Sequence, residues 1–453
     1  MSANLSPVLS SDEIKSLEQD IISAAEADGH EAAWQKAQSL RQAQSHQPDA
    51  AQALLRIIDE QCVPRQAAVD VLTEISQSHP DNANTMRSVG ICLEAARDID
   101  DLNAPPPDEA VFSDVVESLT VFAREHEGLE DEGRILRGLA TSARMMARQS
   151  DDIAEASYRR LVELNPKKCS DHYNLGLFFK TRGRFDEGMQ SNQTAVSLSD
   201  EVVDGYEWNL GICATGAGHG EVALDVWKRM GQKIEMGRFG LPEGGYPQCK
   251  VKLAERPLAE RSAEDDDPGL EETIWIERLS PCHGIIRSVL YQDLGVDYGD
   301  VILIDGAPIT YHTYGDEQIP VFPHLATLSR RNYQIFRFAG TQDEARQLAD
   351  TSMDLDADAI VYSHTESYRE MCSNCWRDPG LDHERHDTME KHVVTGRIAA
   401  PADVAPAQLL DQIDKAVAKR SPCQIYVPDL CIAAGQDNRA SIDKRRFDML
   451  VGN

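Results

Sequence analysis

HYNLG at residues 172–176 returns as EWNLG at residues 207–211, thirty-five positions further along the chain. In each copy a second glycine follows, Gly183 after the first and Gly218 after the second. Gly176 and Gly211 are expected at equivalent positions of consecutive hairpins, where a neighbouring helix packs closely. Glycine also adopts a positive φ at little cost, so Gly183 suits a point where one helix stops and the next begins. Residues 142–207 therefore predict two successive helix–turn–helix hairpins in one register.

The residues around these copies supply the apolar faces that two helices need in order to pack. Leu175, Phe179 and Phe185 fall at helical spacing, and each is expected to face a partner helix. We count three clear or moderate units between residues 136 and 237 and one weak unit near residues 83–116. One hairpin cannot bury its own apolar face, so the units are expected to stack on one another.

A period near 34 residues, with Asn-Leu-Gly early in the unit and Asn165-Pro166 closing a preceding one, resembles the tetratricopeptide repeat. The resemblance covers residues 67–237. It implies an all-α solenoid whose concave groove binds other proteins, and hence a scaffold or adaptor. Two residues depart from the family pattern. Asn192 stands where a large apolar residue is usual, and Asp200 stands where proline is usual.

The charge of the chain argues against two classes of partner. Its 453 residues include 76 aspartates and glutamates against 45 lysines and arginines, which gives a formal net charge of −31. Nucleic-acid surfaces need positive patches that displace counterions, and anionic membranes attract basic surfaces. We therefore expect neither nucleic acid nor membrane as a partner. The acidity either serves solubility alone or gives a groove that selects a basic protein or peptide.

The compartment is predicted from three features of the sequence. No apolar run approaches the roughly 20 residues that cross a bilayer. The first seven residues lack the charged head and the apolar core of a signal peptide. Ten cysteines are spread along the chain, and some of them, such as Cys92, lie inside apolar helical patterns, as free thiols in a reducing compartment do. The prediction is a cytoplasmic protein.

The pattern of the chain changes twice, which predicts an α+β protein overall. Residues 1–240 read as helical, and residues 241–271 read as a loop and acidic linker containing EDDDPG at 264–269. Residues 272–453 alternate strands and helices. Strands are predicted at 273–277, 300–306, 333–338, 359–362, 393–398 and 424–427, and helices at 341–353 and 406–419. Two such strand–helix–strand units predict an α+β sandwich with helices on one sheet face, for which a ferredoxin-like arrangement is suitable.

An insertion at residues 364–392 carries the spacing of a metal site. Cys372 and Cys375 are followed, after seven residues, by His383 and His386. Thiolate sulfur and imidazole nitrogen are ligands that zinc takes in tetrahedral sites. A turn at 378–380 lets the two pairs face each other, so we predict one structural Zn²⁺. The reserve ligands are His364, His392, Cys282 and His283.

Other chemistry is open at this insertion. The alternatives are unliganded thiols in a surface loop, a redox dithiol, and a hydrolytic metal centre with Glu366 or Glu384 as its base. The chain has no glycine pattern for nucleotide phosphates and no Gly-x-Ser-x-Gly elbow. The sequence favours a protein-binding scaffold with no catalytic residues. The alternative is a metal-dependent, hydrolase-like enzyme whose helical domain recruits a protein substrate.

Overall fold

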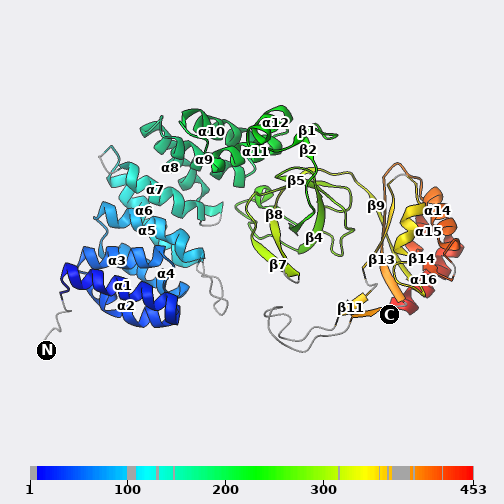
Figure 1. The fold of residues 1–453 in the computed structure, drawn as a ribbon, viewed down its shortest axis with the longest axis horizontal. Coiled ribbons are helices and arrows are strands. Elements are labelled where there is room, and N and C mark those ends of the chain that lie inside the picture. The colour runs from blue at the N-terminus through cyan, green and yellow to red at the C-terminus, as the bar shows by residue number, and fades with distance from the viewer. Residues whose placement is uncertain are drawn as a thin grey trace. The chain divides into compact units, whose positions relative to one another are not determined.

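The computed structural model divides the chain into two compact units (Figure 1). The residues that it describes are 8–98, 109–128, 132–145, 148–314, 317–356, 358–364, 367–369, 388–390, 393–420 and 422–451. The first unit comprises Met1–Phe179, Gln190–Tyr206 and Ser262–Asp266. The second comprises Lys180–Met189, Glu207–Arg261 and Asp267–Asn453. The boundary between the two units falls inside helical hairpins. The last helical residues, from Glu207 onward, are in the same unit as the strands that follow them.

Helices in sequence order build the first unit, and neighbours along the chain pack against each other. They are α1 (Ser11–Asp28), α2 (His30–Gln44), α3 (Pro48–Asp59), α4 (Arg65–Ser78), α5 (Ala83–Asp98), α6 (Glu109–Glu125), α7 (Glu132–Met145) and α8 (Asp151–Leu164), with the 3₁₀ turn η1 (Arg148–Ser150) before α8. The start of α1 is fixed by a capping box. Ser10 Oγ accepts a hydrogen bond from the Glu13 N–H, and the Glu13 carboxylate accepts one from the Ser10 N–H at 2.8 Å. The predicted helical character of this part of the chain is confirmed.

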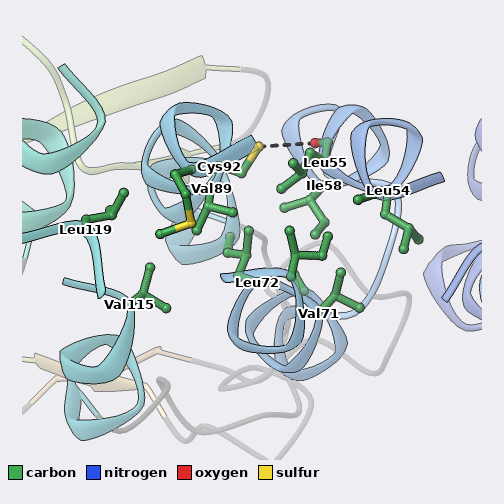
Figure 2. Close-up of a cluster of buried hydrophobic side chains, with 14 of the residues drawn as sticks. Leu54, Leu55, Ile58, Val71, Leu72, Val89, Cys92, Val115 and Leu119 are labelled. Atoms are coloured by element: carbon green, nitrogen blue, oxygen red, sulfur yellow. Dashed lines mark hydrogen bonds between the residues drawn. The ribbon is translucent and has the colours of Figure 1, made fainter. Parts of the chain in front are cut away.

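The core of the first unit runs between helices from successive hairpins. Figure 2 shows Leu55 and Ile58 of α3 converging with Leu72 of α4 and Val89 of α5. Cys92 of α5 lies in the same core, and its thiol donates to the Leu55 carbonyl oxygen at 3.2 Å. Burial raises the pKa of the Cys92 thiol to about 12, so this cysteine is a protonated, apolar packing residue.

The glycines of the repeated pentapeptide occupy equivalent positions in two hairpins. These hairpins are formed by α9 (Cys169–Thr181) with α10 (Phe185–Leu198), and by α11 (Asp204–Gly216) with α12 (Gly220–Arg229). A Cβ atom on Gly176 would lie 2.3 Å from the Asn192 side chain, and one on Gly211 would lie 2.5 Å from the Trp227 ring. In both hairpins the contacted residue comes sixteen positions after the glycine. The predicted close approach of paired helices is therefore confirmed at both glycines.

Replacement of Gly211 by alanine is expected to lower the free energy of unfolding by about 1–3 kcal/mol, because the added methyl group overpacks the helix crossing. Trp227 is fully buried, so its ring cannot move into solvent. Gly133→Ala in α7 is the matched control, because a Cβ there meets no atom nearer than 3.8 Å. Urea unfolding curves of the two variants provide the comparison. Equal midpoints would contradict the close crossing.

A small β-barrel follows the last helices in the second unit. The hairpin of β1 (Ile234–Met236) and β2 (Pro242–Gly244) leads into it. Antiparallel pairing then runs from β3 (Cys249–Ala254) through β4 (Glu271–Arg278), β5 (His283–Ile286) and β6 (Val301–Ile304) to β8 (Glu317–Ser329). Because β8 also pairs in parallel with β3, these five strands close into a ring. The remaining strand, β7 (Thr310–Tyr314), pairs with the first residues of β8.

The structure differs from the prediction of a loop and linker at residues 241–271. β3 lies inside this segment and buries Cys249, Val251 and Leu253 in the barrel core. Its CKVKLA sequence alternates apolar and charged residues as a half-buried strand does, but its pairing partners, β4 and β8, come later in the chain. The acidic run at 264–269 is also fixed to the protein, because Asp266 forms a 3.2 Å ion pair with Arg148. The predicted α+β domain therefore starts earlier than residue 272.

The C-terminal part of the second unit is an antiparallel sheet in the order β10-β13-β9-β14. Its elements are β9 (Gln334–Thr341), the 3₁₀ segment η3 (Ala349–Asp354), β10 (Ile360–Ser363), β13 (Val393–Ala400), α14 (Pro406–Ala418), β14 (Gln424–Tyr426), α15 (Pro428–Ala433) and α16 (Asp437–Val451). This order is that of a split β-α-β, or ferredoxin-like, sheet. One face, with Phe338 and Ile398, packs on Leu409 and Ile413 of α14.

The helix predicted at residues 341–353 is replaced by turns and η3. Side chains satisfy the backbone there: Gln347 Oε1 accepts from the N–H groups of Asp343 and Glu344, and Gln342 Oε1 accepts from that of Leu348. Arg346 has a φ of 67°, which a right-handed helix does not allow. Local side-chain hydrogen bonds thus compete successfully with helix formation.

Two short strands lie inside the predicted insertion at residues 364–392, one before and one after the four predicted zinc ligands. β11 (Ser367–Arg369) and β12 (Thr388–Glu390) pair antiparallel, and Arg369 lies opposite Thr388. The residues between these two strands lie outside the described part of the chain. In the part that the structure describes, no helix is long and apolar enough to cross a membrane.

Candidate binding groove between α4 and α6

A groove in the first unit lies between the end of α4 and the surface of α6. It encloses about 400 Å³. Its lining consists of residues from the end of α4 and the turn after it, and from two turns of α6: Gln77, Pro80, Asp81, Glu117, Ser118, Val121, Phe122 and Glu125. The groove is therefore built by helices of two different hairpins.

Helical geometry explains why these residues of α6 share the groove. Glu117, Val121 and Glu125 follow one another at intervals of four residues, which places them along one face of the helix. Val115 and Leu119 point to the core instead and are 1% and 0% exposed. α6 thus has an apolar face that holds it in place and a second, acidic face that borders the groove.

The floor of the groove is apolar and fixed. Phe122 is buried, and His126 stacks on its ring with centroids 3.9 Å apart. His126 also donates from Nδ1 to the Phe122 carbonyl oxygen at 2.8 Å, so both rings are held by the last turn of the helix. Val121 remains 47% exposed beside this floor. The exposed valine offers a contact for one apolar side chain of a ligand.

The rim of the groove is negative. Asp81, Glu117 and Glu125 are exposed, and within the described part of the chain none of these three carboxylates forms an ion pair or a hydrogen bond. No lysine or arginine is among the residues that line the groove. Some acidic residues elsewhere in the unit are paired: Asp171 forms an ion pair with Arg137 at 3.1 Å, and Glu132 forms one with Arg160 at 2.7 Å. The groove therefore combines free negative charge with an apolar contact.

A second polar cavity, of about 480 Å³, lies in the second unit beside β9 and β13. Four of its charged residues form ion pairs within the lining: Arg337 pairs with Asp429 at 3.2 Å, and Arg397 pairs with Asp297 at 3.9 Å. Burial raises the pKa of the Asp297 carboxyl, which accepts hydrogen bonds from two backbone N–H groups. Unlike the groove, this cavity has no cluster of carboxylates that lack both ion pairs and hydrogen bonds among the described residues.

The four predicted zinc ligands, Cys372, Cys375, His383 and His386, lie outside the described residues, as does the reserve ligand His392. The reserve ligand His364 is half-buried, with Nε2 2.8 Å from the Val289 carbonyl oxygen. Burial lowers its pKa. Among described residues, no group of three or more His, Cys, Asp or Glu side chains is arranged to bind a metal. The zinc site stays a prediction.

The other reserve ligands, Cys282 and His283, are buried and already engaged. Cys282 donates to Thr215 Oγ1 at 3.4 Å, and His283 Nδ1 lies 2.6 Å from Ser280 Oγ. Burial raises the pKa of the Cys282 thiol to about 11 and lowers that of His283 to about 4. Cys282 therefore serves the packing between α11 and the barrel, and the His283 ring is held by the turn that precedes β5.

The groove residues were not singled out by sequence reasoning. A signal was present in α6, where acidic residues flank an apolar one at intervals of four, but no local pattern relates residues 117–125 to Pro80 and Asp81. The two segments meet only because α4 and α6 pack together.

Comparisons with known proteins give no family. No family model and no curated protein matches the chain. Among solved structures, a MamA crystal structure is 18% identical, covers 36% of this chain and 85% of its own, and has a TM-score of 0.28. MamA from Desulfovibrio magneticus RS-1, residues 41 to the end, is 16% identical over 40% of this chain and 92% of its own, with a TM-score of 0.29. At TM-scores this low, the likeness establishes neither the fold nor the function of this chain.

Proposed function

We propose that the chain is a protein-binding scaffold whose helical hairpins hold a basic segment of a partner protein in the groove between α4 and α6. The observation that supports this proposal most strongly is the set of three uncommitted carboxylates around an apolar floor. A lysine or arginine of the partner would approach Glu117 and Glu125, and an apolar neighbour would contact Val121. The resemblance of the hairpins to tetratricopeptide repeats agrees with this role.

The electrostatics give the binding a specific salt dependence. Exposed ion pairs contribute only about 0.2–1 kcal/mol each, so the three carboxylates provide steering and selectivity more than affinity. Screening shortens the reach of exposed charges to about 8 Å at physiological ionic strength. Association with a basic segment should therefore slow as salt is added, whereas the apolar contact at Val121 should change little.

Charge reversal at Glu117 tests the proposal. A fluorescent peptide with alternating lysine and leucine is the probe, and a peptide with glutamate in place of lysine is its negative control. Glu117→Lys is expected to weaken binding of the basic peptide by about three- to tenfold in anisotropy titrations, because an attraction becomes a repulsion. Val121→Ser should weaken it to the same extent at low and high salt.

The matched control is Glu60→Lys, which makes the same change in net charge at the end of α3, away from the groove. If Glu60→Lys weakens binding as much as Glu117→Lys, only the overall charge of the chain matters. Equal binding of the acidic and basic peptides would also contradict the proposal.

We further propose that Cys372, Cys375, His383 and His386 bind one structural Zn²⁺. Their spacing supports this proposal, as does the pairing of β11 with β12, which brings together the two ends of the segment that contains them. Elemental analysis of protein purified without chelator is expected to give about one zinc per chain, and Cys372→Ser should remove it and lower the thermal midpoint. Less than about 0.2 zinc per chain would contradict the site, since structural sites are normally filled.

A further inference from the structure

The barrel has a strand whose outer edge is unpaired. β7 is the last strand in the order β3-β4-β5-β6-β8-β7, and Figure 1 shows it beside β8. Within the described residues, β7 pairs with no strand except β8. Its second edge thus presents backbone N–H and C=O groups that have no strand partner, which makes it a template for another strand.

The side chains of this edge do not block such pairing. Tyr311 is 54% exposed and Ile309 is 52% exposed, and Thr310 and Thr313 are exposed as well. Residues 306–314 include no Asp, Glu, Lys or Arg, although such residues make up 27% of the chain. Edge strands are usually protected by lysine, proline or an inward charge, and β7 has none of these.

The surroundings of His312, at the centre of the strand, disfavour protonation of its ring. His312 Nδ1 lies 3.1 Å from Lys250 Nζ, and burial together with that charge lowers the pKa of His312. Lys250 in turn lies over the Trp275 ring, at 5.3 Å from its centroid. A second strand beside β7 would therefore meet no Asp, Glu, Lys or Arg side chain of β7 itself, and the nearest cation given for the strand is the Lys250 ammonium beside His312.

We infer that β7 pairs antiparallel with β7 of a second copy of this chain, joining two barrels edge to edge. Centred on His312, the pair places Tyr311 of each copy opposite Thr313 of the other, an aromatic beside a β-branched residue. The contact is two-fold symmetric, so one surface serves both copies. A second copy is the favoured occupant because it offers a strand of matching composition that has no Asp, Glu, Lys or Arg, so the two strands bring no carboxylates together in a chain of net charge −31.

The remaining charges determine how this association responds to salt. Two chains of net charge −31 repel at long range, and added salt screens that repulsion. Self-association should therefore strengthen with ionic strength. Binding of a basic peptide in the groove should weaken under the same change, so the two proposals fail independently.

Sedimentation equilibrium of the full chain is the test, over a range of concentrations and at about 0.05 and 0.5 M sodium chloride. A monomer–dimer equilibrium that shifts toward dimer at the higher salt is expected. Tyr311→Lys should weaken it by at least about tenfold, because lysine on an edge strand opposes pairing. Tyr291→Lys is the matched control: that tyrosine is 67% exposed, lies outside any strand, and should leave the equilibrium unchanged.

Thr313→Lys is a second edge variant, for use if Tyr311→Lys alters the circular dichroism of the protein. A monomer at every concentration and salt would overturn the inference. Dimerisation unchanged in both edge variants would overturn it as well. So would a monomeric chain that binds an added extended peptide at β7, because the occupant would then be a different partner.

Discussion

Lys180→Ala is expected to lower the free energy of unfolding of the second unit by about 3–5 kcal/mol, the cost of breaking a buried ion pair on one side. Lys180 is 3% exposed at the end of α9. Its ammonium lies 2.8 Å from Asp305 Oδ2 and 3.0 Å from Asn209 Oδ1. The substitution would leave the Asp305 carboxylate, 18% exposed, without its cation.

The ion pair joins elements that are far apart in the sequence. Asp305 follows β6 of the barrel, and Asn209 lies in α11, beside Trp208, whose ring packs close to Gly306. Lys180 thus fastens the last helices to the barrel. Thermal unfolding of the full chain, monitored by tryptophan fluorescence, should show an early transition in Lys180→Ala, since Trp208 and Trp227 both lie in this unit.

Two further variants separate the effect of burying the ion pair from the effect of losing a charge. Lys419 pairs with Asp354 at 2.8 Å but is 63% exposed, so Lys419→Ala should cost less than about 1 kcal/mol. The double variant Lys180→Met, Asp305→Leu should be much closer to the parent than Lys180→Ala, because it leaves no unpaired buried charge. If Lys180→Ala were no more harmful than Lys419→Ala, the pair would not fasten the barrel.

The barrel is expected to lose stability between pH 6.5 and pH 4, because two buried histidines resist protonation. Burial lowers the pKa of His283 on β5 to about 4, and it does the same for His324 on β8. The unfolded chain binds protons on these rings as the pH falls below 6.5, while the folded chain does not do so until about pH 4. The contribution of each ring is fully present above pH 6.5. It falls by up to roughly 3 kcal/mol on the way to pH 4.

Urea unfolding at a series of pH values measures this effect. His324→Gln and His283→Gln should each reduce the slope of unfolding free energy against pH between pH 6.5 and 5, by up to about 1.4 kcal/mol per pH unit. His46→Gln is the control, because His46 is exposed and lies just after the end of α2. This variant should keep the full slope of unfolding free energy against pH. A slope unchanged in all three variants would mean that carboxylates alone set the acid stability.

Patterns that repeat over short distances were readable without the structure. The Asn-Leu-Gly repeats predicted close helix crossings, and these are found at Gly176 and Gly211. The glycines that follow, Gly183 and Gly218, lie at the turns between helices with φ values of 71° and 77°. The strand patterns at 333–338 and 393–398 became β9 and β13, which pair in register along eight residues. These predictions succeed because side-chain periodicity and glycine conformation depend on near neighbours in the chain.

Features that need a distant partner were not readable in the same way. The alternating sequence of β3 reads as part of a linker when taken alone, because the strands that give it a place in a barrel begin seventeen residues or more after it ends. The helix expected at 341–353 gave way to turns once Gln342 and Gln347 bonded to the backbone. The zinc ligands stay a prediction from spacing alone.

The sequence by itself therefore determined a helical repeat followed by an α+β region, its acidity and its helix-crossing glycines, since these follow from composition and local period. Only the tertiary structure decided that the barrel closes through β3 and that Lys180 pairs with Asp305, 125 residues away. It also decided that Asp81 borders the same groove as Glu117 and Glu125. Which residues meet across such separations depends on how whole helices and strands pack, and local sequence does not encode that choice.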